Sequence, residues 1–282
     1  MLYQKNGRVY IAARSEPKVR QAIQEIRDAT PASSGTLEYL PLDLADLSSV
    51  KAAAEDFKAK ESRLHVLWNN AGVSQPPLGS LSKQGIELQL ATNCLGPYLF
   101  TQLLLPLLKS TAAAEATKDP PSSSSVRVIW TSSQMTELSA PKGGLVLSEL
   151  RTPPKNTTRN YVNSKTGNLF LATELARKEP AVISIALNPG AASTNLFRHT
   201  PMTKYLAWPL LHAAKLAALT QLYAGFSGDI TVEKNGCYVV PWGRIGGLRK
   251  DLVDATKAAE DGGTGRAAEF WDWCVDATRE FQ

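Results

Sequence analysis

The sequence predicts an α/β fold in which a doubly wound parallel sheet carries helices on both faces. Short runs rich in β-branched and aromatic residues alternate with longer runs of helical periodicity, a pattern typical of parallel strands joined by crossover helices. Polar or glycine-rich residues follow the predicted strands directly. The chain has 282 residues and is 43% hydrophobic, which is enough for one large core, so we expect a single domain over residues 1–282.

The first strand is predicted at residues 8–13 and the first helix directly after it. Ser15 can cap this helix, Pro17 suits its first turn, and Val19 and Ile23 recur at helical spacing. The same alternation continues along the chain. It predicts strands at 36–40, 64–68, 126–131, 182–187 and 236–240, helices at 47–60, 86–108 and 159–178, and a helical tail from Asp251.

Two segments are predicted to be loops. Residues 112–125 contain Pro120, Pro121 and four serines, which indicates a flexible connection and not a domain boundary. Residues 139–158 contain Gly143-Gly144 and a second pair of prolines. Both loops interrupt the alternation of strands and helices without adding a repeat.

Tyr161 and Lys165 lie four residues apart in the helix predicted over residues 159–178. Residues at i and i+4 share a helix face, so a phenol and an ammonium group can reach the same reacting atom. A nearby cation favours the ionised phenol, whose usual pKa is about 10. Such a tyrosine could exchange protons with an alcohol or a carbonyl near neutral pH. For this motif alone, an exposed pair on an ordinary helix is the alternative.

The carboxyl ends of the predicted strands form an ordered set of polar and glycine-rich motifs. Ligands of open parallel sheets bind beyond these ends, so the motifs outline a cleft. In chain order they are Ala13-Arg14-Ser15, Asp43-Leu44, Asn69-Asn70-Ala71-Gly72, Thr131-Ser132-Ser133 and Asn188-Pro189-Gly190.

Together with Tyr161 and Lys165, this set resembles the short-chain dehydrogenase/reductase family. The resemblance runs from about Arg8 to about Asn195, and more loosely to Trp242. It implies a Rossmann-like fold and an oxidoreductase that interconverts a small-molecule carbonyl and the corresponding alcohol with a nicotinamide cofactor, as a carbonyl reductase does.

The resemblance implies four catalytic roles. Tyr161 would be the acid/base, and Lys165 would lower its pKa and bind the ribose next to the nicotinamide. Ser133 would position the substrate carbonyl, a role that suits a hydroxyl because it stabilises negative charge developing on oxygen. Asn93 would support a proton-relay water near the lysine. The alternative for Asn93 is a helix-interior amide bonded to nearby backbone.

The resemblance also implies a cofactor site along the same strand ends. Its contacts would be Asp43 at the adenine, Asn69, Ala71 and Gly72 at the adenine ribose and the central sheet, and Pro189, Gly190 and Thr194 at the nicotinamide and pyrophosphate.

Arg14 bears on the choice of cofactor. Family members that select NAD end the second family strand with an acidic residue, whereas this chain has Ala13 followed by Arg14 and Ser15. A guanidinium and a hydroxyl suit a 2′-phosphate, so we expect NADP(H). The alternative is that Arg14 is simply solvated.

The spacing between Ser133 and Tyr161 is 28 residues (from position 133 to position 161), longer than in the compact members of the family. This spacing resembles the branch of the retinol dehydrogenases and the WW-domain oxidoreductases. The resemblance places the substrate loop at residues 195–226, whose Leu, Ala, Tyr and Trp content favours a hydrophobic or aromatic substrate.

The start of the family pattern is expected to be absent. In the family, a glycine-rich turn after the first strand holds the cofactor pyrophosphate, but only Gly7 and Gly35 occur in the first 60 residues. The cluster at residues 243–247 is a weak substitute. We therefore expect strands with unpaired edges, and a catalytically impaired scaffold or binding protein is the alternative function.

Charge and cysteine content exclude several other classes. The net charge is +5 and the 31 basic residues are dispersed, so a nucleic-acid partner is not expected. The three cysteines form no CxxC motif, which indicates neither a disulfide framework nor a zinc site, and a reduced cytoplasmic location is the simplest interpretation. Residues 205–226 are too interrupted for a transmembrane segment but leave contact with a membrane surface open. A homodimer is also allowed.

Overall fold

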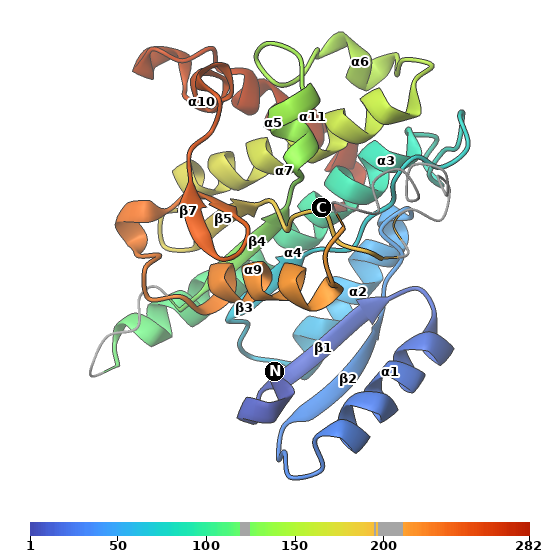
Figure 1. Cartoon of the computed structure of the whole chain (residues 1–282), viewed down its shortest axis with the longest axis vertical. Helices are drawn as coiled ribbons and strands as arrows, with labels where there is room; N and C mark the ends of the chain where they lie inside the picture. The colour runs from blue at the N-terminus through green and yellow to red at the C-terminus, as the bar shows by residue number, and fades with distance from the viewer. Residues whose placement is uncertain (119–124, 195, 197–210) are drawn as a thin grey trace.

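The computed structural model describes residues 1–118, 125–194, 196 and 211–282, and these contain two sheets (Figure 1). In the first sheet, β1 (Arg8–Ala13) and β2 (Thr36–Pro41) pair in parallel over their whole length. In the second sheet the order is β3-β4-β5-β6-β7. Its strands are β3 (Val66–Asn69), β4 (Arg127–Thr131), β5 (Ile183–Leu187), β6 (Tyr238–Val240) and β7 (Arg244–Gly246). The neighbours from β3 to β6 are parallel, and β7 is antiparallel to β6.

Within the described part of the chain, β1 pairs with β2 alone, and β3, an edge strand of the second sheet, pairs with β4 alone. Each of these two strands therefore leaves one row of backbone N–H and C=O groups outside the strand ladders. The unpaired edges that the sequence predicts are thus present, and they lie on either side of the break between the sheets.

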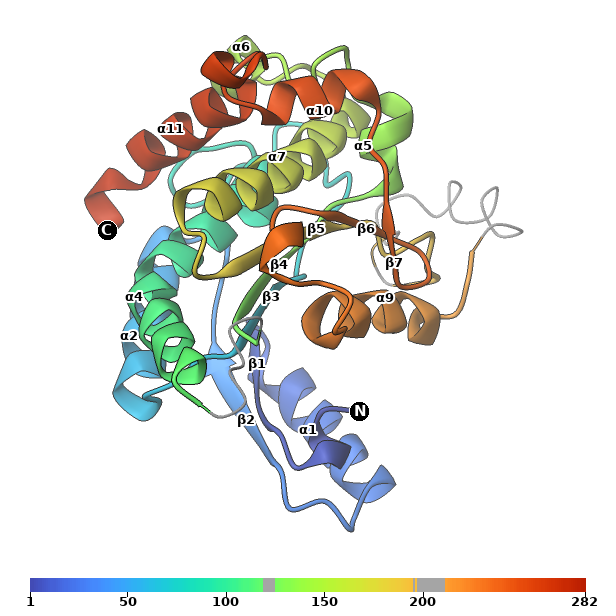
Figure 2. The ribbon, with the colours of Figure 1, turned by 90° about the vertical axis from the view of Figure 1, so that its left-hand side faces the viewer.

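Helices lie on both faces of the strands, as predicted (Figure 2). On one face lie α2 (Leu47–Lys60), α4 (Gly96–Ala116) and α7 (Thr157–Lys178), which share the largest core cluster with β4 and β5. All five residues of β4 and of β5 are buried, as expected for strands covered on both faces. α11 (Arg266–Thr278) packs against α7.

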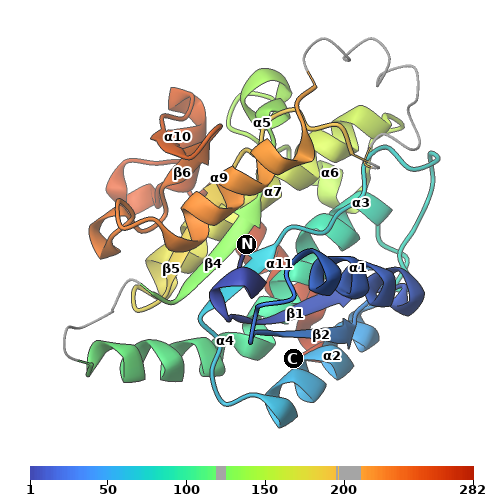
Figure 3. The same cartoon turned by 60° about the horizontal axis from the view of Figure 1, so that its bottom comes forward.

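The opposite face is covered by α9 (Ala214–Phe226) and α1 (Glu16–Ala29). α9 contributes Ala224 to a core cluster that includes Ile129 and Ile183. α1 lies over β1 and β2 (Figure 3) and packs Val19 and Ile23 against Leu37. The remaining helices are α3 (Leu88–Leu90), α5 (Gln134–Ser139), α6 (Ser148–Arg151) and α10 (Lys250–Thr256). Short 3-10 turns lie at η1 (Tyr3–Lys5), η5 (Val232–Lys234), η6 (Ala259–Asp261) and η7 (Arg279–Phe281).

Three elements differ from the sequence prediction. The helix expected over 86–108 is divided into α3, a π-helical turn η2 (Ala91–Leu95) and α4, which continues to Ala116. In this extension Thr111 is buried, and its hydroxyl accepts a hydrogen bond from the N–H of Leu64 at 3.0 Å. The loop expected over 139–158 contains α6. In the other expected loop, 112–125, residues 112–116 belong to α4 and residues 119–124 lie outside the described residues.

The third difference concerns the glycine cluster at residues 243–247, which forms β7 and its flanks and does not open a helix. Gly243 has a φ of +89° in the turn between β6 and β7, a conformation that favours glycine. The cluster therefore forms a reversal of the chain and lacks the strand-turn-helix arrangement of a phosphate-binding loop.

Candidate active site

A cavity of about 1240 Å³ lies at the carboxyl ends of β3, β4 and β5 and extends to the edge of β1. Its polar end is lined by Ser133, Tyr161 and Lys165. Its apolar end is lined by side chains near the break between the sheets, among them Leu2, Val9, Ile11, Leu37 and Trp68. The break between the sheets and the predicted catalytic residues therefore belong to one continuous space.

Tyr161 and Lys165 lie on α7, whose first turn is capped by Asn156 through a bond from the N–H of Arg159 at 2.9 Å. Tyr161 is 8% exposed and Lys165 is 4% exposed. The Lys165 Nζ lies 5.8 Å from the centroid of the Tyr161 ring and donates to the carbonyl of Thr131 at 2.9 Å. The two side chains share one helix face, as their spacing predicts.

Burial controls the pKa of both side chains in this structure. It raises the pKa of Tyr161, and an interaction with the Ser133 hydroxyl opposes this rise. Burial also lowers the pKa of Lys165 to about 8. Because desolvation disfavours each charged form, the expected lowering of the Tyr161 pKa by Lys165 is not the dominant effect here and stays a prediction.

Ser133 follows β4 and occupies the N-cap of α5. Its Oγ accepts a hydrogen bond from the N–H of Met135 at 3.2 Å. This bond uses one lone pair and leaves the O–H of Ser133 able to donate. The hydroxyl of Ser132, by contrast, donates to the carbonyl of Lys165 at 2.8 Å. Of the two adjacent serines, Ser133 is therefore the one whose donor can serve a substrate oxygen.

Asn93 lies in the π-helical turn η2 and is fully bonded to protein. Its Nδ2 donates to the carbonyl of Val73 at 3.0 Å and to the hydroxyl of Ser164 at 2.8 Å, and its Oδ1 accepts from the N–H of Val73 at 2.8 Å. Asn93 thus ties the loop after β3 to α7. These contacts fit the alternative hypothesis for Asn93, an amide bonded to nearby backbone. Its support of a proton-relay water stays a prediction.

Gly72 lines the cavity and lies next to the Asn93 amide. A Cβ on Gly72 would be 2.7 Å from Asn93 Oδ1 and 3.6 Å from Lys165 Nζ. The distance to Lys165 is an ordinary contact, but only glycine leaves room for the Asn93 amide at its present position.

The other predicted cofactor residues fall into two groups. Ala71, Gly72, Pro189, Gly190 and Thr194 line the cavity with the catalytic side chains. Gly190 has a φ of +79°, and a Cβ there would be 2.9 Å from the ring of Trp242.

Arg14, Asp43 and Asn69 are outside the cavity wall. Arg14 is exposed just after the end of β1. One Asp43 carboxylate oxygen accepts from the N–H of Ala45 at 3.0 Å. The Asn69 Nδ2 donates to the hydroxyl of Thr101 at 2.9 Å, which fits support of the sheet.

Sequence reasoning missed Gln221, which lies on α9 and lines the cavity. Its Nε2 donates to Asn70 Oδ1 and to the Thr131 hydroxyl, each at 3.0 Å, so it joins the ends of β3 and β4. Its backbone carbonyl accepts from the indole N–H of Trp68 at 3.2 Å. No signal in the sequence indicates these contacts, because they depend on how α9 lies against the sheet.

Two kinds of feature are absent from the described residues. No helix among them is long and apolar enough to cross a bilayer. In the same part of the chain, no group of three or more His, Cys, Asp or Glu side chains could hold a metal ion.

The chain is similar to known proteins along its length. A family model described as short chain dehydrogenase matches residues 1–204. The short-chain dehydrogenase/reductase iacJ of Pestalotiopsis fici is 42% identical over 281 residues, which cover 97% of this chain and 83% of that protein.

Solved structures share the fold. A crystal structure of an uncharacterized protein from Mycobacterium Paratuberculosis has a TM-score of 0.69 and 26% identity, and covers 99% of this chain and 86% of that one. The NADPH-bound carbonyl reductase from chicken fatty liver has a TM-score of 0.60 and 22% identity, and covers 86% of this chain and 88% of that one.

Proposed function

The chain belongs to the short-chain dehydrogenase/reductase family, and we propose that it is an NADP(H)-dependent oxidoreductase that interconverts a carbonyl and an alcohol on a small hydrophobic or aromatic substrate. The observation that carries this proposal is the convergence of Ser133, Tyr161 and Lys165 on one cavity wall. The three come from a strand end and a helix, and their polar groups suit one reacting oxygen.

Each residue has a role that follows from its chemistry. The Tyr161 O–H donates a proton to the carbonyl oxygen during reduction and takes it back during oxidation. The Ser133 O–H donates a hydrogen bond to the same oxygen and stabilises the negative charge that develops there. Lys165, held by the Thr131 carbonyl, keeps a positive charge beside the phenol. The nicotinamide cofactor, when bound, supplies or accepts the hydride.

The polar end of the cavity fits the nicotinamide and its ribose. An ammonium has three N–H donors, and among the described residues Thr131 O is the one hydrogen-bond acceptor of Lys165. Two donors are therefore left for ribose hydroxyls. Gly190, Pro189 and Thr194 line the same end and supply a close backbone approach.

The apolar end does not fit a pyrophosphate group. Leu2, Val9 and Ile11 line it, and no glycine-rich turn opens a helix there in the part of the chain that the structure describes. Phosphate groups are held by such turns or by cations, and the apolar side chains at this end provide neither backbone donors nor positive charge. Our proposal therefore assigns no pyrophosphate ligand.

The proposed cofactor rests on the exposure of Arg14, and the proposed substrate class rests on the side chains that line the cavity. Arg14 is exposed just beyond the carboxyl end of β1, where a guanidinium can meet a 2′-phosphate. The chicken carbonyl reductase that shares the fold is bound to NADPH in its crystal structure. Trp68, Leu211 and Leu222 line the cavity and favour an apolar substrate. Residues 195 and 197–210 of the expected substrate loop lie outside the described residues.

The break between the sheets favours a second candidate, a catalytically impaired scaffold or binding protein. Titration of the 282-residue chain with NADPH, followed by reduction assays on aromatic ketones and quinones, separates the two. Micromolar binding with turnover that is lost in Tyr161→Phe supports the oxidoreductase. A folded chain that neither binds NADPH nor turns over any ketone supports the binding protein.

We extend the proposal to the organisation and the environment of the chain. Residues 1–282 would act as one domain in the cytoplasm. The homodimer and the contact with a membrane surface stay predictions. Light scattering after gel filtration tests the first, and co-sedimentation with anionic liposomes tests the second.

A further inference from the structure

The cavity wall contains Ser133, but the segment that carries this serine is short. Ser133 leads into α5, which has six residues and ends at Ser139. A helix of this length has little stability of its own, and its last carbonyls have no partner within the helix. α5 packs against α7, and its buried Thr136 lies 3.1 Å, hydroxyl to hydroxyl, from Ser132. The rest of the helix, and with it the orientation of Ser133, depends on what holds the far end.

Arg249 holds that end. Its Nη1 donates to the carbonyl of Glu137 at 2.8 Å, and its Nη2 donates to the carbonyls of Ala140 and Pro141 at 3.1 Å each. Its backbone N–H also donates to Glu137 Oε2 at 3.2 Å. A cation at the carboxyl end of a helix is favourable because it meets the last carbonyls and the negative end of the dipole.

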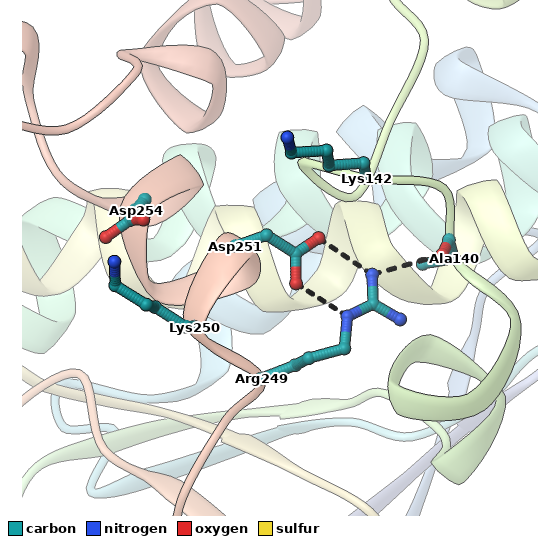
Figure 4. A pocket seen from close by; sticks show the side chains of 6 residues that line it. All are labelled: Ala140, Lys142, Arg249, Lys250, Asp251 and Asp254. Carbon is teal, nitrogen blue, oxygen red and sulfur yellow. Dashed lines mark hydrogen bonds and ion pairs between the residues drawn. The ribbon is translucent and has the colours of Figure 1, made fainter.

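Asp251 fixes the direction of the guanidinium (Figure 4). Arg249 Nε donates to Asp251 Oδ1 at 2.6 Å and Nη2 donates to Oδ2 at 2.8 Å, a bidentate pair. The same Oδ2 accepts from the N–H of Gly143 at 2.8 Å. Hydrogen bonds from Arg249 hold the pKa of Asp251 well below its usual range, so the carboxylate stays charged at neutral pH.

The turn beyond α5 is held from a second side. Arg266 on α11 donates to the carbonyl of Leu145 at 2.8 Å. Gly144 is buried with its Cα against Phe170 and Thr166 of α7, where a Cβ would lie 2.8 Å and 2.9 Å from them. The end of α5 is therefore anchored to the helix that carries Tyr161 and to the C-terminal segment.

At the other end of α5, the N–H of Met135 bonds to the Ser133 Oγ at 3.2 Å. This bond exists only while the first turn of α5 is formed. Loosening the far end of a six-residue helix loosens this turn too, since the whole helix is little more than one and a half turns long.

We propose that Arg249 and Asp251 are positioning residues for Ser133, acting through α5 to aim its hydroxyl at the substrate oxygen. The inference rests on the proposed function for the role of Ser133, while the anchoring of α5 does not depend on it. Neither residue touches the cavity that contains the catalytic side chains.

The test compares the full-length chain with Arg249→Lys, which keeps the charge and loses the planar fork. Lys250→Met is the matched control, because it removes the exposed cation next in sequence. Asp251→Asn is the second variant if Arg249→Lys does not fold. Circular dichroism and thermal unfolding establish folding for each protein.

Hydrogen exchange measures the anchoring directly. In Arg249→Lys, we expect the amides of residues 134–145 to exchange on the order of ten times faster than in wild type, with β4 and α7 unchanged. Lys250→Met should match wild type. Unchanged exchange at Met135 in both Arg249→Lys and Asp251→Asn would overturn the proposal.

Kinetics measure the consequence. The kcat of Arg249→Lys should fall about ten-fold with little change in KM, because Ser133 acts on charge that develops in the transition state. In a Ser133→Ala background, Arg249→Lys should cost less than about two-fold. Fully additive losses would overturn the proposal, because a general structural defect would not depend on Ser133. If wild type itself has no turnover, the proposed function fails and the exchange at Met135 still decides the anchoring.

Discussion

Gly72→Ala tests whether the tie made by Asn93 stabilises the fold. The added Cβ would lie 2.7 Å from Asn93 Oδ1 and 3.4 Å from its Cγ, so the amide must move. That amide makes three hydrogen bonds, to the two backbone groups of Val73 and to Ser164, and it is 1% exposed. Movement therefore lengthens bonds whose groups have no access to water.

The cost follows from two contributions. Overpacking a buried site costs about 1–3 kcal/mol, and leaving one buried group without its partner costs about 1–3 kcal/mol. The structure around Asn93 will relax in part, so we expect a loss of about 2–4 kcal/mol in the free energy of unfolding. Lys165 Nζ, 3.6 Å from the same Cβ, would be in ordinary van der Waals contact and need not move.

Urea unfolding followed by circular dichroism gives the measurement. Gly228→Ala is the matched control, since a Cβ there meets nothing within 4 Å and the residue lacks a positive φ; it should change stability by about 0.5 kcal/mol or less. A Gly72→Ala variant as stable as this control would refute the reasoning. It would mean that the loop after β3 moves freely and that Asn93 does not hold it.

Three further outcomes follow from the site. Tyr161→Phe should lower kcat by about 10²–10⁴ while the unfolding midpoint stays near that of wild type, measured on the substrate found by the ketone and quinone assays. Burial lowers the pKa of Lys165 from 10.5 to about 8, so between these pH values the unfolded chain binds more protons than the folded chain. The stability of wild type relative to Lys165→Met should therefore rise by at most about 3 kcal/mol as the pH rises from about 8 to about 10.5. A difference that does not change with pH would contradict this prediction. Gln221→Leu should cost about 0.5–1 kcal/mol in the free energy of unfolding, because the buried Thr131 hydroxyl loses a donor whereas Asn70 is exposed to water, with Lys215→Leu on the same helix as the control.

Much of the fold could be predicted from local patterns. The bounds of α2 and β1 agree with the prediction because apolar periodicity and turn residues act over a few neighbours. The prediction that Tyr161 and Lys165 face the same way was confirmed for the same reason, since the pitch of one helix determines it. The side-chain cap expected from Ser15 is wrong, because no hydrogen bond links its side chain to α1.

The sequence by itself determined which chemical groups are present and which of them share an element: the phenol and ammonium of α7, and the polar ends of successive strands. Only the tertiary structure decided which of them meet. Asn93 bonds to Ser164 across 71 positions and Arg249 bonds to Glu137 across 112. Contacts at such separation depend on how whole helices pack on the sheet. That packing is determined by apolar burial over the entire core, which no pattern of neighbouring residues contains.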